Sequence, residues 1–178
     1  LHPVRRPTCA AGPVGGSHVP VVISSRPGGD GSCGDVRPDF VYCGAALPAP
    51  GRRLEGAAYI VDAPAWRGEE GTCPAYTPDN LFAVGASDAP VKFLFLNYLA
   101  LGDEVKACLR RHPEMVVVAQ TVHPNPTGEL RALVHELWRE NIPAPVVLCL
   151  AYDLGADRTE DFQLRAAADA GALLFDGL

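Results

Sequence analysis

Nine polar side chains, most of them directly after apolar runs, are the residues of this sequence best placed for chemistry. In α/β barrels, binding and catalytic groups gather at the C-terminal ends of the strands. Asp, Asn and Thr at such positions also cap helices and satisfy loop backbone groups. We therefore treat them as a candidate strand-end or docking face and assign no catalytic residue: Asp62, Asn97, Gln120, Thr121, His123, Asn125, Arg131, Asp153 and Asp176.

A glycine-rich segment, Gly29–Gly34, matches the G-x-G-x-x-G pattern of dinucleotide-binding loops. That pattern needs a helix to begin at its last glycine, so that the helix N-terminus meets the pyrophosphate. Here Asp35–Pro38 follows, and then another apolar run begins, which leaves no room for the helix. We interpret the segment as a flexible loop. Its backbone amides could alternatively form a nest for a phosphorylated ligand.

Metal-binding and nucleophile motifs are incomplete in this sequence. His135-Glu136 begins like the zinc motif H-E-x-x-H, but Arg139 stands where the second histidine belongs. The six cysteines, at 9, 33, 43, 73, 108 and 149, are widely spaced and form no Cys-x-x-Cys pair. An iron–sulfur cluster needs clustered thiolates. The chain is therefore expected to bind no cluster, zinc or dinucleotide by itself. The wide, irregular spacing of its cysteines and the lack of anything like a secretory signal favour a reducing cytoplasm.

The elements that must position these residues can be predicted from apolar runs. Seven short runs are apolar on consecutive positions, which is typical of strands buried on both faces of a parallel sheet. They cover Val19–Ser24, Asp39–Cys43, Ala57–Val61, Val91–Leu96, Met115–Thr121, Val146–Leu150 and Ala172–Phe175.

Helical periodicity separates the later runs, at Gly102–Arg111, Thr127–Asn141 and Thr159–Ala170. The resulting strand–helix alternation predicts right-handed crossovers and a parallel sheet. Gly/Pro loops separate the earlier runs. We expect an α/β fold with an incomplete or degenerate TIM-like barrel over residues 19–178, after an irregular lead-in at 1–18. An open parallel α/β sheet is the alternative.

Composition and charge exclude two classes of partner, nucleic acid and membrane. The chain has 178 residues, 48% hydrophobic and 20% charged, with a net charge of −6. Duplex DNA requires a concentrated basic face, which is not visible here, so nucleic acid is not an expected partner. No apolar run approaches the roughly 18 residues that span a bilayer, so no membrane partner is expected. The chain lacks an initial Met, and we expect it to be a segment of a longer polypeptide.

An ordered series of segments resembles one enzyme family. The segments are Val61–Trp66, Cys73–Pro78, Val91–Phe95, His123–Asn125, Gly128–Ala132 and Ala166–Gly177. They are similar to the central insert of the long form of 4-hydroxy-3-methylbut-2-enyl diphosphate synthase (the GcpE or IspG family), in its bacterial, Bacteroidetes-like version. The likeness covers about residues 19–178.

The resemblance implies a parent enzyme that reductively opens a cyclic diphosphate in the non-mevalonate isoprenoid pathway. It implies a four-iron–four-sulfur cluster in a C-terminal domain, a substrate site on an N-terminal barrel, and a mainly structural insert between them. No position here matches the family's cluster cysteines or substrate-binding residues. The expected partners are the flanking catalytic domains, with a second subunit as a further candidate. An independent barrel enzyme, or a small-ligand module using the strand-end residues, remains the alternative.

Overall fold

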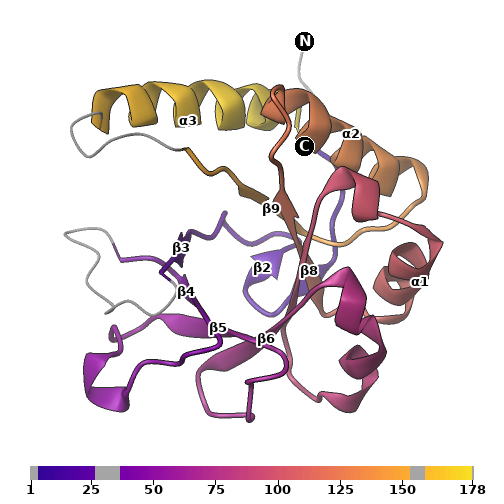
Figure 1. Ribbon diagram of the computed structural model, residues 1–178. Coiled ribbons are helices and arrows are strands. Elements are labelled where there is room, and N and C mark those ends of the chain that lie inside the picture. The colour runs from indigo at the N-terminus through magenta and orange to yellow at the C-terminus, as the bar shows by residue number, and fades with distance from the viewer. Residues whose placement is uncertain (1–3, 27–36, 153–158, 178) are drawn as a thin grey trace.

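Seven parallel strands form one sheet that curls into a half-barrel (Figure 1). The computed structural model describes residues 4–26, 37–152 and 159–177. The strands pair in chain order, so each new strand is added beside the one before it. They are β3 (Ile23–Ser25), β4 (Phe40–Gly44), β5 (Ala58–Asp62), β6 (Thr72–Tyr76), β7 (Lys92–Leu96), β8 (Met115–Gln120) and β9 (Val146–Cys149). The curled parallel sheet confirms the predicted incomplete barrel.

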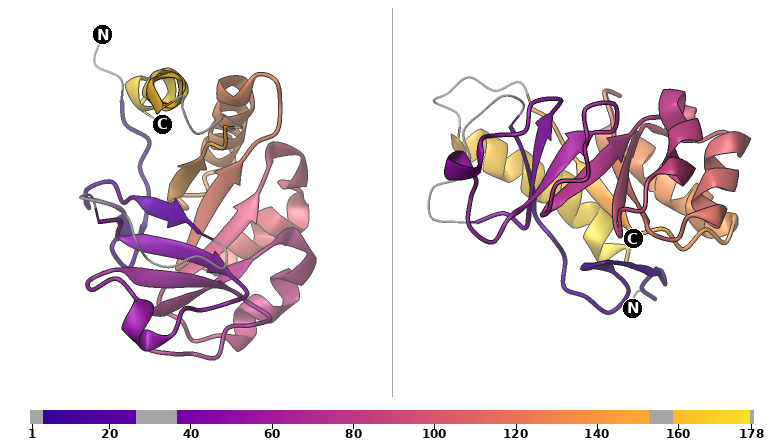
Figure 2. Two further views of the ribbon diagram at one scale, coloured as in Figure 1. Left: turned by 60° about the vertical axis from the view of Figure 1, so that its left-hand side comes forward. Right: turned by 90° about the horizontal axis from the view of Figure 1, so that it is seen from below.

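Three α-helices lie in the second half of the described chain: α1 (Asp103–Arg111), α2 (Pro126–Arg139) and α3 (Thr159–Phe175). Helices α1 and α2 cover the outer face of the later strands, and α3 packs beside α2 (Figure 2). Acidic residues occupy the first turn of α1 and basic residues its last turn, which suits the helix dipole. Short 3-10 helices occur among the loops: η1 (Pro50–Arg52), η2 (Pro78–Ala86) and η3 (Tyr98–Ala100).

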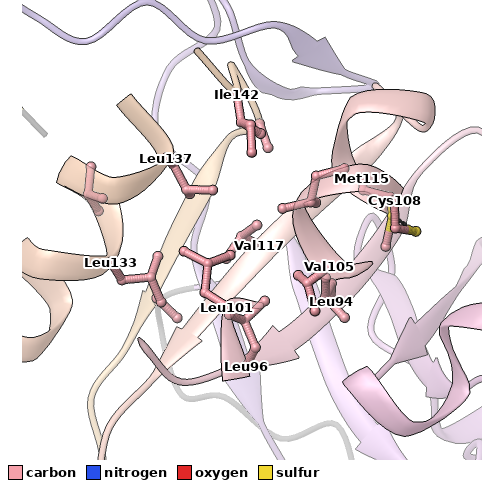
Figure 3. Packing of buried hydrophobic residues seen from close by; sticks show 14 of the residues in the cluster. Leu94, Leu96, Leu101, Val105, Cys108, Met115, Val117, Leu133, Leu137 and Ile142 are labelled. Atoms are coloured by element: carbon pink, nitrogen blue, oxygen red, sulfur yellow. Dashed lines mark hydrogen bonds between the residues drawn. The ribbon is translucent and has the colours of Figure 1, made fainter. Parts of the chain in front are cut away.

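Two apolar layers hold the sheet from opposite faces, and a smaller cluster on β4 and β5 adds to them. The inner layer fills the half-barrel with side chains such as Phe40, Ile60, Phe93 and Val116. The outer layer lies between the sheet and the helices (Figure 3), and is formed by Leu94, Leu96, Leu101, Val105, Cys108, Met115, Val117, Leu133, Leu137 and Ile142 among others. Burial on both faces explains why these strands are continuously apolar in the sequence.

A small hairpin, β1 (Ala10–Ala11) with β2 (Val14–Gly15), packs against the inner layer. Ala11 and Val14 are buried against that layer. Gly15 has a φ of +78°, and a Cβ there would approach Pro145, just before β9, to 2.6 Å. Glycine is therefore required for the hairpin to approach the sheet so closely. The lead-in residues thus contribute to the barrel core.

Two sequence predictions about the elements are wrong. Thr72–Tyr76 forms the central strand β6, although no strand was expected there. Its Pro74 and the absence of a β-branched run conceal it, because proline is unusual within a sheet. Ala172–Phe175 forms the last turn of α3 and not a strand. A short apolar run fits either element, and only tertiary contacts decide between them.

Candidate functional site

Inward-facing and strand-terminal residues meet at the C-terminal mouth of the half-barrel. The Tyr42 hydroxyl, on β4, donates a hydrogen bond of 2.8 Å to Asp62 Oδ1 at the end of β5. The Tyr42 ring lies 4.7 Å from the ring of Phe95 on β7, centroid to centroid. Both rings pack on the inner apolar layer. The mouth therefore has an aromatic floor and a hydroxyl–carboxylate pair above it.

The environment of this pair keeps the tyrosine protonated. Burial, followed by the hydrogen bond and negative charge of Asp62, raises the pKa of Tyr42 from 10.0 to about 12. A neutral phenol can donate a hydrogen bond at physiological pH, but it cannot act as a base. Asp62 in turn has one of its oxygens occupied by that donor.

Gln120 and Cys149 form the next part of the mouth. They are register partners at the ends of β8 and β9. Burial raises the pKa of the Cys149 thiol, and a hydrogen bond with the Gln120 side chain opposes that rise only in part. The thiol is therefore protonated at neutral pH and is a poor nucleophile.

Four of the predicted site residues cap helices or order the loop after β8. Asn97 Oδ1 accepts from Ala100 N at 3.0 Å at the start of η3, and Asn125 Oδ1 accepts from Gly128 N at 3.0 Å at the start of α2. Thr121 donates to the Glu129 carboxylate and accepts from His123 N. His123 Nδ1 accepts from Asn125 N at 3.0 Å. These contacts match the capping role that Asn and Thr often have.

Asp176 was expected at the end of a strand, and that placement is wrong. It follows the last turn of α3, beside Gly177, whose carbonyl accepts from Arg6 N. Arg6 also donates to the carbonyls of Ile142 and Ala144, which precede β9. Asp176 therefore lies toward the opposite end of the sheet from the mouth. It pairs with Arg131 and joins α2 to α3.

Two predicted features lie outside the described residues. They are Asp153 and the loop Gly29–Gly34 with its G-x-G-x-x-G pattern. The mouth as described contains Asp62, Gln120, Thr121 and His123 from the predicted set.

Sequence reasoning missed Tyr42, Phe95 and Cys149 as parts of the mouth. Each is the third or fourth residue of an apolar strand, and such residues are usually core. The signal that could have found Tyr42 is a polar hydroxyl in a strand next to one that ends in an acid.

The described cysteines do not fit a cluster. Cys9, Cys43, Cys73, Cys108 and Cys149 are all free thiols; Cys9 lies in the loop before β1 and the other four lie on separate elements. Burial raises the pKa of Cys73 to about 11, so its thiolate is disfavoured. In the described part of the chain, no three His, Cys, Asp or Glu side chains gather where they could hold a metal ion.

His135-Glu136 has a structural role on α2. Glu136 accepts hydrogen bonds from Lys106 on α1 and from Arg139 one turn later. The His135 ring stacks on Trp138 with centroids 6.1 Å apart. These contacts agree with a charged helix surface and not with a zinc site.

Comparison with known proteins identifies the family. A protein of Bacteroides thetaiotaomicron named 4-hydroxy-3-methylbut-2-en-1-yl diphosphate synthase (flavodoxin) is 48% identical over 179 residues, covering all of this chain. Proteins of the same name from Bacteroides fragilis and Phocaeicola vulgatus are 45% and 43% identical, again over the whole chain. The chain belongs to this synthase family. The resemblance inferred from the sequence is thereby confirmed.

The chain spans about 28% of the length of the synthases from these Bacteroides species that it matches. No family model matches the chain, and no solved structure matches it. Among the described helices, none is long and apolar enough to cross a membrane.

Proposed function

We propose that this chain is a structural docking domain of a 4-hydroxy-3-methylbut-2-en-1-yl diphosphate synthase, with residues 19–178 as a barrel-like insert domain. The observation that carries the proposal is that the whole chain matches a segment that makes up 28% of the length of a synthase. The parent enzyme then opens a cyclic diphosphate reductively in isoprenoid biosynthesis, as an oxidoreductase of the cytoplasm. This chain holds the flanking catalytic domains in position.

The chemistry of the described residues supports a non-catalytic role. The mouth offers a neutral tyrosine, a carboxylate already bonded to it, an amide and a protonated thiol. General acid–base catalysis needs a group free to exchange a proton with the substrate. In the described mouth, raised pKa values keep Tyr42 and Cys149 protonated, and His123 Nδ1 is occupied as the acceptor of a hydrogen bond from Asn125 N. Of the other predicted polar residues that the structure describes, Asn97 and Asn125 cap helices, and Arg131 with Asp176 joins α2 to α3.

The four-iron–four-sulfur cluster and the substrate are proposed to lie on the flanking domains of the same polypeptide. A docking domain influences rate through geometry, because a misplacement of ~1 Å between reacting groups can cost about a hundredfold. A second subunit is a further proposed partner of the docking surface.

Cysteine substitution in the full-length synthase tests the location of the cluster. Cys43→Ala, Cys73→Ala, Cys108→Ala and Cys149→Ala should each retain the iron content and cluster absorbance of the unaltered enzyme. Loss of about one cluster per chain in a variant that stays folded would contradict the proposal. Circular dichroism gives the folding control, because Cys73 and Cys108 are buried and their truncation costs stability.

A further inference from the structure

The mouth of the half-barrel contains a carboxylate that has no ion-pair partner among the described residues. Asp62 ends β5 and is half-buried. Its Oδ1 accepts a hydrogen bond of 2.8 Å from the neutral Tyr42 hydroxyl. None of the ion pairs of the described residues includes Asp62. A charge held partly out of water is costly unless it is paired, so a cationic ligand would complete this site.

A second tyrosine–aspartate pair in the same molecule shows what a purely structural carboxylate looks like. Asp169 on α3 accepts a hydrogen bond of 2.7 Å from the Tyr152 hydroxyl on Oδ2 and one of 3.1 Å from Thr127 on Oδ1. Both of its oxygens therefore have protein donors, and the contacts join α3 to α2 and to the chain after β9. Asp62 has a described donor on one oxygen only. A structural role thus accounts for Asp169 but leaves the second oxygen of Asp62 unexplained.

Two aromatic rings lie next to this carboxylate. The Tyr42 ring lies 4.7 Å from the Phe95 ring, centroid to centroid, with an angle of 37° between the ring planes. Phe93, two residues earlier on the same face of β7, is fully buried, whereas Tyr42 and Phe95 are only half-buried. The two rings therefore end the inner apolar layer and present part of their surface to the mouth. Apolar surface beside one charged group suits a ligand with a charged head and a short apolar tail.

Charge restricts the kind of ligand that this part of the mouth accepts. Arg26, which follows β3, donates from Nε to Ser24 Oγ at 3.2 Å and is not ion-paired with Asp62. The net charge of the whole chain is −6. An anion, such as the cyclic diphosphate proposed for the parent enzyme, is repelled by such a surface, whereas a cation is attracted. The last inward-facing side chains of the seven described strands include one acid and no base: Ser25, Tyr42, Asp62, Ala75, Phe95, Gln120 and Cys149.

We propose that the mouth of the half-barrel binds a small alkylammonium ion, whose ammonium group pairs with Asp62 and whose tail lies on the Tyr42 and Phe95 rings. Ammonium N–H groups donate charge-assisted hydrogen bonds to carboxylate oxygens, and Oδ2 of Asp62 has no donor among the described residues. Aromatic rings bind apolar tails and attract cations. The ligand is distinct from the substrate of the synthase, so the inference goes beyond the docking role and does not depend on it.

Saturation-transfer NMR on the full-length synthase tests the site with n-butylammonium chloride as the probe. The tail protons of the probe should receive saturation from the protein, and the signal should reach a plateau as the probe concentration rises. The neutral alcohol n-butanol is the matched control ligand, because it has the same tail and no charge. An equal concentration of n-butanol should leave the n-butylammonium signal unchanged.

Three variants of the full-length synthase test which residues hold the probe. Asp62→Asn keeps an oxygen that accepts from Tyr42 but removes the charge, so it should weaken the affinity for n-butylammonium about tenfold. Phe95→Leu keeps an apolar side chain but removes the ring, so it should weaken the affinity about threefold. Asp88→Asn is the matched control, because it removes an exposed acid from the loop before β7 and should leave the affinity unchanged.

Absence of saturable n-butylammonium binding to the unaltered synthase would overturn the proposal. Equal affinities of Asp62→Asn and the unaltered enzyme would also overturn it, as would displacement of the probe by n-butanol. A loss of affinity in Asp88→Asn as large as that in Asp62→Asn would show only a general attraction of cations to an acidic surface, and would overturn it too. None of these readouts uses turnover, so failure of the ligand site is separable from failure of the docking role.

Discussion

At the level of single residues, the Tyr42–Asp62 hydrogen bond is the most distinctive polar contact of the mouth. Tyr42→Phe should lower the free energy of unfolding by about 0.5–1.5 kcal/mol at pH 8, because one hydrogen bond is lost. The folded-state pKa of Tyr42, about 12, lies above its ordinary 10.0. Its contribution is therefore complete below pH 10 and is lost as the pH rises through 12.

Urea denaturation between pH 8 and 12 measures this dependence. The difference in unfolding free energy between the unaltered chain and Tyr42→Phe should shrink above pH 10. A difference that stays constant across the range would contradict the assignment, because ionisation of the Tyr42 hydroxyl would then leave its contribution to stability unchanged.

A second residue-level prediction concerns Lys92, whose side chain is almost fully buried in β7. Its Nζ lies 2.8 Å from Glu114 Oε1. Burial alone would raise the pKa of Glu114, but hydrogen bonds with Lys92, with the backbone and with His112, together with the charge of Lys92, outweigh it and leave that pKa lowered. Glu114→Gln should destabilise the fold by about 1–3 kcal/mol, since it leaves a buried ammonium without its counter-charge.

Lys92→Met is the matched control for that change. It removes the buried charge and leaves Glu114 partly exposed beside His112, so its cost should be smaller than that of Glu114→Gln. Thermal unfolding of both variants at neutral pH decides the order, and the reverse order would refute the assignment.

Single-residue roles were only partly predictable from the sequence. Asn97 and Asn125 follow a strand and precede a helix, and local hydrogen bonding explains both as caps. Tyr42 and Phe95 belong to the mouth only because β4 and β7 turn them to the same side of a curled sheet. That depends on long-range pairing, which one sequence does not reveal.

At the level of elements, α2 shows how well the helical period of apolar residues predicts which side chains are buried. The period predicts Leu130, Leu133, Val134, Leu137 and Trp138 on one face, and the first four are buried. Trp138 is 36% exposed and stacks on His135. Leu133→Ala should cost about 2–5 kcal/mol, because it opens a cavity in the outer layer.

Trp138→Ala should cost clearly less than Leu133→Ala, because much of the indole already meets solvent. Chemical denaturation of the two variants gives the comparison. Equal losses of unfolding free energy would contradict this prediction. They would mean that Trp138 is packed as fully as Leu133.

Element prediction succeeded where the period was long and failed where it was short. α1 begins and ends within one residue of its expected bounds, because charged first and last turns mark both termini. The run at Ala172–Phe175 is apolar for four residues, which a strand and a helix satisfy equally. The strand β6 was hidden by Pro74, whose place in the sheet depends on its neighbours β5 and β7.

At the level of the whole molecule, strand–helix alternation predicts a parallel sheet but leaves its curvature open. Curling follows from the twist of successive parallel strands and from the inner layer of large side chains that must be enclosed. Phe40 and Phe93 meet edge to face at 5.2 Å inside the half-barrel. Such contacts between non-neighbouring strands exist only in a curled sheet, and the periodicity of one strand carries no trace of them.

Turnover of the full-length synthase with altered mouth residues tests the docking role most directly. Asp62→Asn, Gln120→Ala and His123→Ala should each keep turnover within about tenfold of the unaltered enzyme, because none of these groups is proposed to meet the substrate. General acid–base residues contribute a hundredfold or more. A hundredfold loss in any one of these variants, with stability and iron content unchanged, would contradict the structural role and make the mouth of the half-barrel a catalytic site.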